Sequence, residues 1–190
     1  LDALCHAVES FWSVNAGKES QKVAAEAIRM VLAYEDAYLA NQPEGNEKML
    51  LAANLAGKAI NYTKTTAGHA MAYKLTTLYG LAHGHAVALC VDALWPYMIG
   101  HTEDAMDVRG KAYLDDMFLR LAQVMGCASS MDAAVKYHEM LEQLHLSRPE
   151  VKSVEELELL AGSVNPERLG NNPVCLKKEV LRSLYARIAK

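Results

Sequence analysis

The sequence is poor in residues that break helices or staple chains together. Its 190 residues include only 11 glycines, 5 prolines and 4 cysteines, and no two cysteines form a CxxC pair. The cysteines lie within apolar helical patterns, so we expect reduced thiols and a cytoplasmic location. A chain of this length buries enough apolar surface to fold without a disulfide or a structural metal. Any metal is therefore expected to serve function.

Other scarcities exclude whole classes of partner. The 19 Lys and Arg residues are outnumbered by 23 Asp and Glu residues, for a formal charge of −4, so the basic field that attracts nucleic acids and acidic membranes is missing. No run approaches the ~20 apolar residues of a membrane span. There is also no GxGxxG fingerprint after a strand and no P-loop. We expect no nucleic-acid or membrane partner, and we expect a cofactor, if one is used, to be held mainly by something else.

The apolar residues that are present recur at helical spacing, and no segment alternates as a strand does. Breaks fall at Gly80, Gly100, Gly126 and Pro149. The pattern predicts one all-α domain over residues 1–190, a multi-helix bundle. Helices are expected over 19–40, 46–61, 67–79, 84–98, 103–125, 131–145, 153–161 and 176–188.

Two of these helices carry a prediction about position. The segment 46–61 is rich in alanine and glycine, which lets another backbone approach closely, so we expect it to be central. The segment 85–95 is apolar on nearly all sides, which indicates a helix buried in the middle of the bundle.

Acidic and imidazole side chains form the pattern that carries chemistry. Asp2 and His6 stand four residues apart on one helix face, a spacing that is more typical of a surface ion pair. Three of the seven histidines (His69, His83 and His85) fall in one apolar, small-residue stretch. A buried imidazole needs partners for both nitrogens, and metal ligation is one solution. One Asp with three His would suit Fe²⁺ or Zn²⁺.

Two other classes stay open on the residues alone. A helical bundle with Asp and His ligands also suits a hydrolase that activates water on a metal. Alternatively, the chain is a structural helical module whose buried histidines are satisfied by hydrogen bonds.

Two motifs make the sequence recognisable. The opening Asp2-Ala-Leu-Cys-His6-Ala-Val-Glu9 resembles the DALxHAxE signature of the iron-containing (group III) alcohol dehydrogenase family, and residues 68–84 resemble its GxxHAxxHxxG…HG segment. The resemblance continues to Asn165-Pro166 and the helix around Glu179. It implies the helical C-terminal domain of the dehydroquinate synthase-like fold. The divalent metal ligands that it implies are Asp2, His6, His69 and His83.

The resemblance also implies a larger enzyme. The family that this chain resembles has two domains. An N-terminal α/β domain holds NAD or NADP, and the helical domain holds the metal. This chain matches only the helical half and starts at Leu1 as if inside a helix, so we expect an excised domain, inactive in isolation. The implied reaction interconverts an alcohol and an aldehyde in an enzyme that we expect to be a homo-oligomer.

The sequence departs from the family at one position. Many members carry a second histidine four residues after the ligand of the HAxxH segment, where this chain has Tyr73. That histidine is discussed as a proton relay beside the nicotinamide. Tyr73 or His85 is the candidate to replace it, although Tyr73 as a packed aromatic and His85 as a supporting histidine are the alternatives.

Further residues suggest the substrate. The segments 57–66 and 83–89 look most like the branch that acts on phosphonoacetaldehyde. An anionic substrate would give a role to Lys64 and to the hydroxyls of Thr65 and Thr66, although Lys58 and Lys64 are equally consistent with solvated lysines.

Four remaining residues receive structural predictions. Glu9, one turn beyond His6, is expected either to orient that imidazole or to be a solvated carboxylate. His101, His138 and His145 are expected at the surface or in structural roles.

Overall fold

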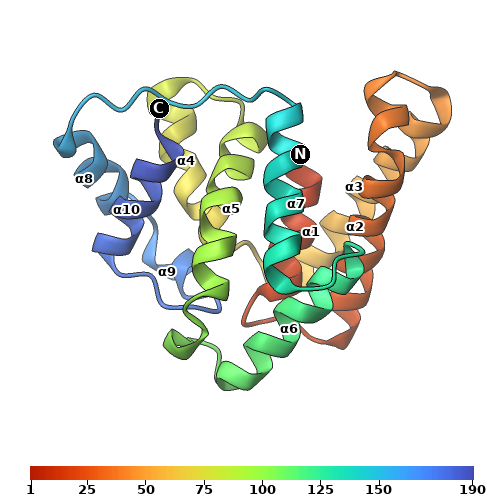
Figure 1. Cartoon of the computed structure of the whole chain (residues 1–190), viewed down its shortest axis with the longest axis horizontal. Coiled ribbons are helices and arrows are strands. Elements are labelled where there is room, and N and C mark those ends of the chain that lie inside the picture. The colour runs from red at the N-terminus through yellow and green to blue at the C-terminus, as the bar shows by residue number, and fades with distance from the viewer.

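The computed structural model describes residues 1–190 as a bundle of ten α-helices and one short 3₁₀ helix, with a single isolated β-bridge between Ala105 and Val174. Figure 1 shows the helices arranged side by side without a sheet, which confirms the all-α prediction. The helices are α1 (Asp2–Trp12), α2 (Lys18–Leu39), α3 (Pro43–Thr63), α4 (Ala67–Tyr79), α5 (His83–Ile99), η1 (Thr102–Asp104), α6 (Gly110–Val124), α7 (Ser130–Gln143), α8 (Val154–Gly162), α9 (Pro166–Leu169) and α10 (Lys178–Ile188).

Helix α5 occupies the middle of the bundle, as its all-round apolar sequence predicts (Figure 1). It packs against α1, α4, α7 and α10, so each of its faces meets another helix. Helix α1 is the second central element, with Val8, Phe11 and Trp12 at most 3% exposed. The two helices bury one contiguous core, and their N-terminal turns carry Asp2 and His83.

The α2–α3 hairpin lies at one end of the molecule (Figure 1), so the prediction that 46–61 is central is wrong. Its small residues do allow close approach: a Cβ on Gly45 would lie 2.4 Å from the backbone of Ala37 in α2. Ala52 and Ala56 are buried against α1 and α2, but Leu50 on the other face is 75% exposed. Close packing on one face does not require a central position.

The predicted helix 103–125 is also wrong over its first part. Residues 102–104 form a 3₁₀ turn, and α6 begins only at Gly110, whose φ of +77° favours glycine. Between them, Asp107 binds the backbone N–H and the guanidinium of Arg109. These local hydrogen bonds compete with helical ones and delay the start of the helix.

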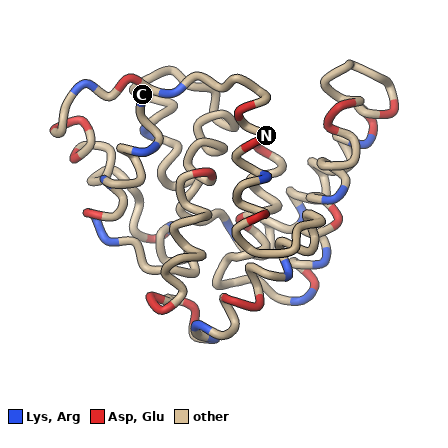
Figure 2. Tube along the Cα trace, viewed as in Figure 1, with Lys and Arg blue, Asp and Glu red and all other residues tan.

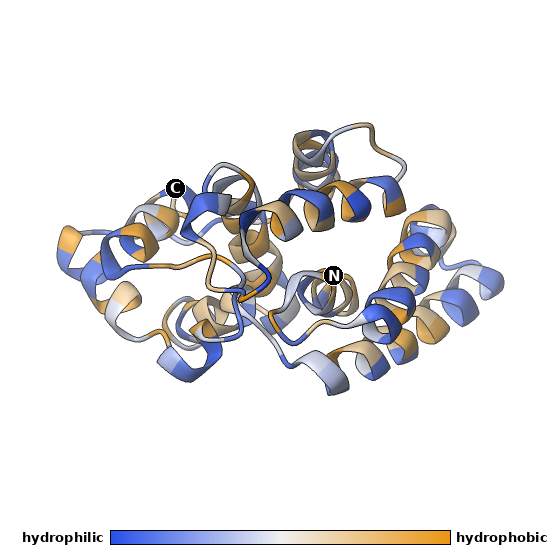
Figure 3. Ribbon diagram, turned by 90° about the horizontal axis from the view of Figure 1, so that it is seen from below, coloured by the Kyte–Doolittle hydropathy of each residue, from blue (hydrophilic) through white to orange (hydrophobic).

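Charged residues of both signs are mixed, as their similar numbers in the sequence predict. Basic and acidic residues are interspersed along the chain (Figure 2), and hydrophilic and hydrophobic residues alternate along the peripheral helices (Figure 3). No helix combines the length and apolarity that crossing a bilayer requires. All four cysteines are free, and Cys5 and Cys90 are buried, in agreement with the prediction of reduced thiols.

Candidate metal centre

Three helix N-termini bring the predicted ligands together. Asp2 lies in the first turn of α1, His69 in the first turn of α4, and His83 is the first residue of α5. One ligand atom from each of Asp2, His6 and His69 lies within 4.8 Å of the other two. The ring of His83 lies beside that of His69, with 5.5 Å between ring centroids.

The separations are too long for hydrogen bonds and suit a shared ion. Asp2 Oδ2 lies 3.6 Å from His6 Nδ1, while Asp2 Oδ1 lies 3.6 Å from His69 Nε2 and 4.0 Å from His83 Nε2. The centre is enclosed on the side of His69, whose side chain is 2% exposed, and open on the side of Asp2 and His83, at 44% and 38%. A small molecule therefore has access from that side.

Two atoms at this centre show that a cation fits. Asp2 Oδ1 and His69 Nε2 are buried and have no hydrogen-bond partner. Unsatisfied buried polar atoms are costly, and these two face one another. Three imidazole nitrogens and one carboxylate oxygen form a donor set that suits Fe²⁺ or Zn²⁺. A divalent cation held by Asp2, His6, His69 and His83 would satisfy both orphaned atoms.

Two glycines allow the helices to approach one another here. A Cβ on Gly84 would lie 2.8 Å from Asp2 Cβ, and a Cβ on Gly68 would lie 2.7 Å from Glu9 Oε1. Real Cβ atoms do not approach so closely, so both positions need glycine for the present packing. The glycines that flank the histidines in the sequence thus set the spacing between α1, α4 and α5.

Glu9 supports the centre from inside the core. Its carboxylate is fully buried and accepts hydrogen bonds from the hydroxyl of Thr66 (2.7 Å) and the backbone N–H of His69 (3.3 Å). It also pairs with Nδ1 of His69. The predictions for Glu9 therefore need correction: it is not solvated, and the imidazole that it orients is that of His69, because α4 and not α1 presents a ring to it.

The charged forms of Glu9 and His69 stabilise each other. Burial disfavours the charged forms of both Glu9 and His69, but their attraction and hydrogen bonds outweigh it. The pKa of Glu9 is consequently lowered, and the pKa of His69 is raised to about 9 with a further contribution from Asp2. The contact with His69 also lowers the pKa of Asp2. Burial, together with the charge of His69, lowers the pKa of His6.

The predicted substrate residues separate in space. Thr66 is fully buried, donating to Glu9 and accepting from Trp12 Nε1 at 2.9 Å, so the prediction that its hydroxyl binds substrate is wrong. Thr65 is partly exposed and lies beside Arg168. Lys64 ends α3 with a φ of +59° and an exposed side chain that makes no ion pair.

The two relay candidates differ in their surroundings. The ring of Tyr73 stacks on His83, with 5.5 Å between centroids and 28° between planes, and the residue is 42% exposed. His85 is turned away from this contact, with its Nε2 2.7 Å from the backbone oxygen of Ser147. Of the two, Tyr73 is the one stacked on a residue of the candidate centre.

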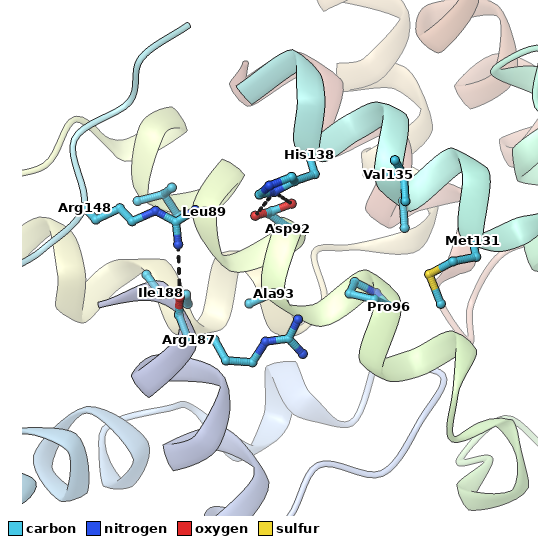
Figure 4. Close-up of a pocket in the computed structure, with 11 residues that line it drawn as sticks. Leu89, Asp92, Ala93, Pro96, Met131, Val135, His138, Arg148, Arg187 and Ile188 are labelled. Carbon is cyan, nitrogen blue, oxygen red and sulfur yellow. Dashed lines mark hydrogen bonds and ion pairs between the residues drawn. The ribbon is translucent and has the colours of Figure 1, made fainter. Parts of the chain in front are cut away.

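The remaining histidines lie in the structural surroundings expected for them. His101 Nδ1 binds the backbone oxygen of Tyr97 at 2.8 Å, and His145 follows α7 in a turn with a φ of +50°. His138 pairs with Asp92 across α7 and α5 beside a cavity of about 250 Å³ (Figure 4).

Sequence reasoning missed one residue beside the site. Arg168 of α9 donates from Nη1 to Thr65 Oγ1 at 2.9 Å, and its guanidinium carbon lies 4.9 Å from the ring centre of Tyr73. Helix α9 is a single turn between Asn165-Pro166 and Gly170, so it shows no helical period. The N-cap signal of Asn165 before Pro166 marks a helix start, but it gives no hint that the turn packs on α4.

Residues 1–189 match the Fe-containing alcohol dehydrogenase family, C-terminal. A phosphonoacetaldehyde reductase from Streptomyces viridochromogenes is 30% identical over 97% of this chain and 47% of its own length. A 1,3-propanediol dehydrogenase from Klebsiella pneumoniae is 30% identical over 90% of this chain and 46% of its own. The chain thus spans about half the length of these relatives.

Solved structures show the same fold. An iron-containing alcohol dehydrogenase from Thermotoga maritima superposes with a TM-score of 0.78 at 28% identity, covering 98% of this chain and 47% of that one. A sulfoacetaldehyde reductase from Bifidobacterium kashiwanohense, solved in complex with NAD⁺, gives a TM-score of 0.83 at 27% identity over 100% and 48% of the two chains. With residues 1–189 matched and the helical fold shared, the chain belongs to the iron-containing alcohol dehydrogenase family and corresponds to its C-terminal helical domain.

Proposed function

We propose that this chain is the metal-binding half of an NAD(P)-dependent alcohol dehydrogenase or aldehyde reductase, preceded in the complete enzyme by a nucleotide-binding domain. The proposal rests on the convergence of Asp2, His6, His69 and His83. Two atoms of this cluster, Asp2 Oδ1 and His69 Nε2, are buried and have no hydrogen-bond partner. Family membership favours this reaction over the hydrolase and the structural module.

Each residue of the centre has a role in this function. Asp2, His6, His69 and His83 would hold Fe²⁺ or Zn²⁺, which supplies Lewis-acid polarisation of a carbonyl or alcohol oxygen. When a cation replaces the Nε2 proton of His69, Glu9 would hold the remaining proton on Nδ1, so that Nε2 presents its lone pair to the cation. The exposed side of Asp2 and His83 admits the substrate.

Tyr73 is the proposed proton relay. Its ring lies over His83 at the open side, where its phenol would donate a proton to the substrate oxygen; a bound nicotinamide would supply the hydride. His85 is the weaker candidate because its Nε2 is engaged with Ser147.

The proposed substrate is a short aldehyde that carries an anionic group, such as phosphonoacetaldehyde. Two similar proteins support this class by name: a phosphonoacetaldehyde reductase and a sulfoacetaldehyde reductase.

The test is metal content and turnover of the complete enzyme, as wild type and as His69→Ala. The wild type is expected to bind one divalent cation per chain and to reduce aldehydes with NADH or NADPH, whereas His69→Ala loses both. His101→Ala, at a histidine whose ring bonds the backbone oxygen of Tyr97 and stacks on the Tyr97 ring, is the matched control and is expected to retain both. Full turnover by His69→Ala with metal still bound would sink the proposal.

A further inference from the structure

One cation beside the metal centre has no anionic partner. Arg168 is partly buried, yet no carboxylate lies within 4.0 Å of its guanidinium, whereas six other Lys or Arg residues pair with an Asp or a Glu. Its one hydrogen bond to the protein goes to Thr65 Oγ1, which uses one of the five N–H donors of a guanidinium. Withdrawing a charge from water without a partner costs free energy, so the site is prepared for an anion from outside the protein.

Contacts with Thr65 and Tyr73 hold this arginine near the centre. Its guanidinium lies over one part of Tyr73, and Tyr73 in turn stacks on the ligand candidate His83. The guanidinium carbon of Arg168 lies 4.9 Å from the ring centre of Tyr73, which lies 5.5 Å from the ring centre of His83. The distance between that carbon and the ring centre of His83 is therefore at most the sum of these two distances. This upper bound is compatible with a compact molecule that carries a carbonyl at one end and an anionic group at the other.

The polar frame around Arg168 is held by neighbouring loops. Asn171 donates to the backbone oxygen of Thr65 at 3.0 Å, and Asn15 donates to the side-chain oxygen of Asn171 at 3.0 Å. These bonds tie the segment after α9 to the residue that precedes the N-cap of α4. The Thr65 hydroxyl and the guanidinium are thus pre-positioned side by side, which reduces the entropy lost when a ligand binds.

We propose that Arg168, together with the hydroxyl of Thr65, recognises the anionic head group of the substrate, a phosphonate, sulfonate or carboxylate on a short aldehyde. A planar guanidinium binds such groups through two parallel N–H bonds, whereas Lys64 offers only a mobile point charge on the exposed end of α3. The assignment rests on the function proposed above and makes Arg168 a determinant of substrate specificity.

The experiment measures kcat/KM of the complete, metal-loaded enzyme for phosphonoacetaldehyde and for propanal, which lacks the anionic group. Arg168→Gln is expected to lower kcat/KM for phosphonoacetaldehyde roughly 10- to 100-fold, as the loss of hydrogen bonds to a charged group does, and to leave propanal within about twofold. Arg168→Lys should keep part of the preference, since it keeps the charge and loses the paired donors. Arg29→Gln, at an exposed arginine of α2 that makes no ion pair, is the control and should leave the ratio unchanged.

Binding of methylphosphonate to the enzyme after chelation of its metal gives a second readout, independent of turnover. Weaker binding by Arg168→Gln than by Arg29→Gln supports the assignment. Equal binding by the two, or an unchanged substrate ratio in Arg168→Gln and Arg168→Lys, overturns it. The proposed function fails separately: an enzyme that reduces neither aldehyde but binds methylphosphonate through Arg168 loses the dehydrogenase proposal and keeps the anion site.

Discussion

Glu9 and His69 form a fully buried pair in which the carboxylate binds Nδ1 of the imidazole, while Nε2 of the same ring faces Asp2 at 3.6 Å. The pair joins the core of the bundle to the candidate metal centre. Glu9 also accepts a hydrogen bond from the hydroxyl of Thr66, and that hydroxyl accepts a hydrogen bond from Trp12 Nε1. The orientation of the predicted ligand His69 thus depends on residues that are buried in the core.

Replacing Glu9 by Gln tests this dependence. The amide preserves shape but removes the charge that holds the Nδ1 proton, so the cation affinity of the chain is expected to fall roughly 10- to 100-fold. Competition with a chelator of known affinity measures the change for Zn²⁺. Glu26→Gln, at an exposed glutamate of α2, should leave the affinity unchanged. Equal affinities for the two variants would mean that Glu9 serves packing alone.

Gly84 gives a second prediction about the centre. A Cβ at this position meets Asp2 Cβ at 2.8 Å and Asp2 N at 3.0 Å, so Gly84→Ala pushes Asp2 away from the three histidines. We expect the affinity for Zn²⁺ in the same chelator competition to fall roughly tenfold or more. Gly57→Ala is the matched control: nothing lies within 4 Å of the added Cβ in the middle of α3. This variant should bind metal normally and gain about 0.5–1 kcal/mol of stability from the lower entropy of the unfolded chain.

The sequence predicts well those helices whose apolar pattern and end signals are clear. The predicted helix 67–79 matches α4 at both ends. It ends at Tyr79 because Gly80, directly after it, adopts a φ of +67°. The central position of α5 follows from its apolar faces, since only a helix covered on all sides buries them.

Features that depend on contacts between distant residues were missed. Small residues in α3 predict close packing but not which helix supplies the other face, so the prediction of a central position for residues 46–61 is wrong. Glu9 stands three residues from both His6 and Trp12 in the sequence, yet its partners Thr66 and His69 lie 57 and 60 residues away. Arg168 is 103 residues from Thr65, and no local periodicity links the two.

Tyr73 provides a prediction about the reaction. If its phenol relays a proton, Tyr73→Phe lowers kcat for aldehyde reduction by roughly 10²-fold or more, with metal content unchanged. Tyr73→His, which restores the residue found in many family members, should recover part of the lost rate and shift the pH profile toward the imidazole pKa. Steady-state rates across pH 6–10 measure both effects. A Tyr73→Phe enzyme with the wild-type rate and profile would identify Tyr73 as a packed aromatic only.

The last prediction concerns stability in acid. Asp107 is 3% exposed and binds Arg109, whose guanidinium also donates to the backbone oxygen of Ala16 at 2.6 Å. Burial raises the pKa of Asp107, but the hydrogen bonds and charge of Arg109 outweigh it, so the pKa is lowered on folding. A lowered pKa adds stability above the unfolded-state value of about 3.9, and this gain is lost as the pH falls through the folded-state value.

Asp107→Asn is therefore expected to lower the free energy of unfolding by roughly 1.5–3 kcal/mol at pH 7. Because the wild type loses the same interaction in acid, the difference between the two proteins should shrink below about pH 4. Urea denaturation from pH 7 to pH 3 measures both quantities. Asp116→Asn breaks an exposed pair with Arg120 and should change the stability by less than about 1 kcal/mol. A difference for Asp107→Asn that stays constant down to pH 3 would show that its charge does not contribute, and that the loss comes from packing in the loop before α6.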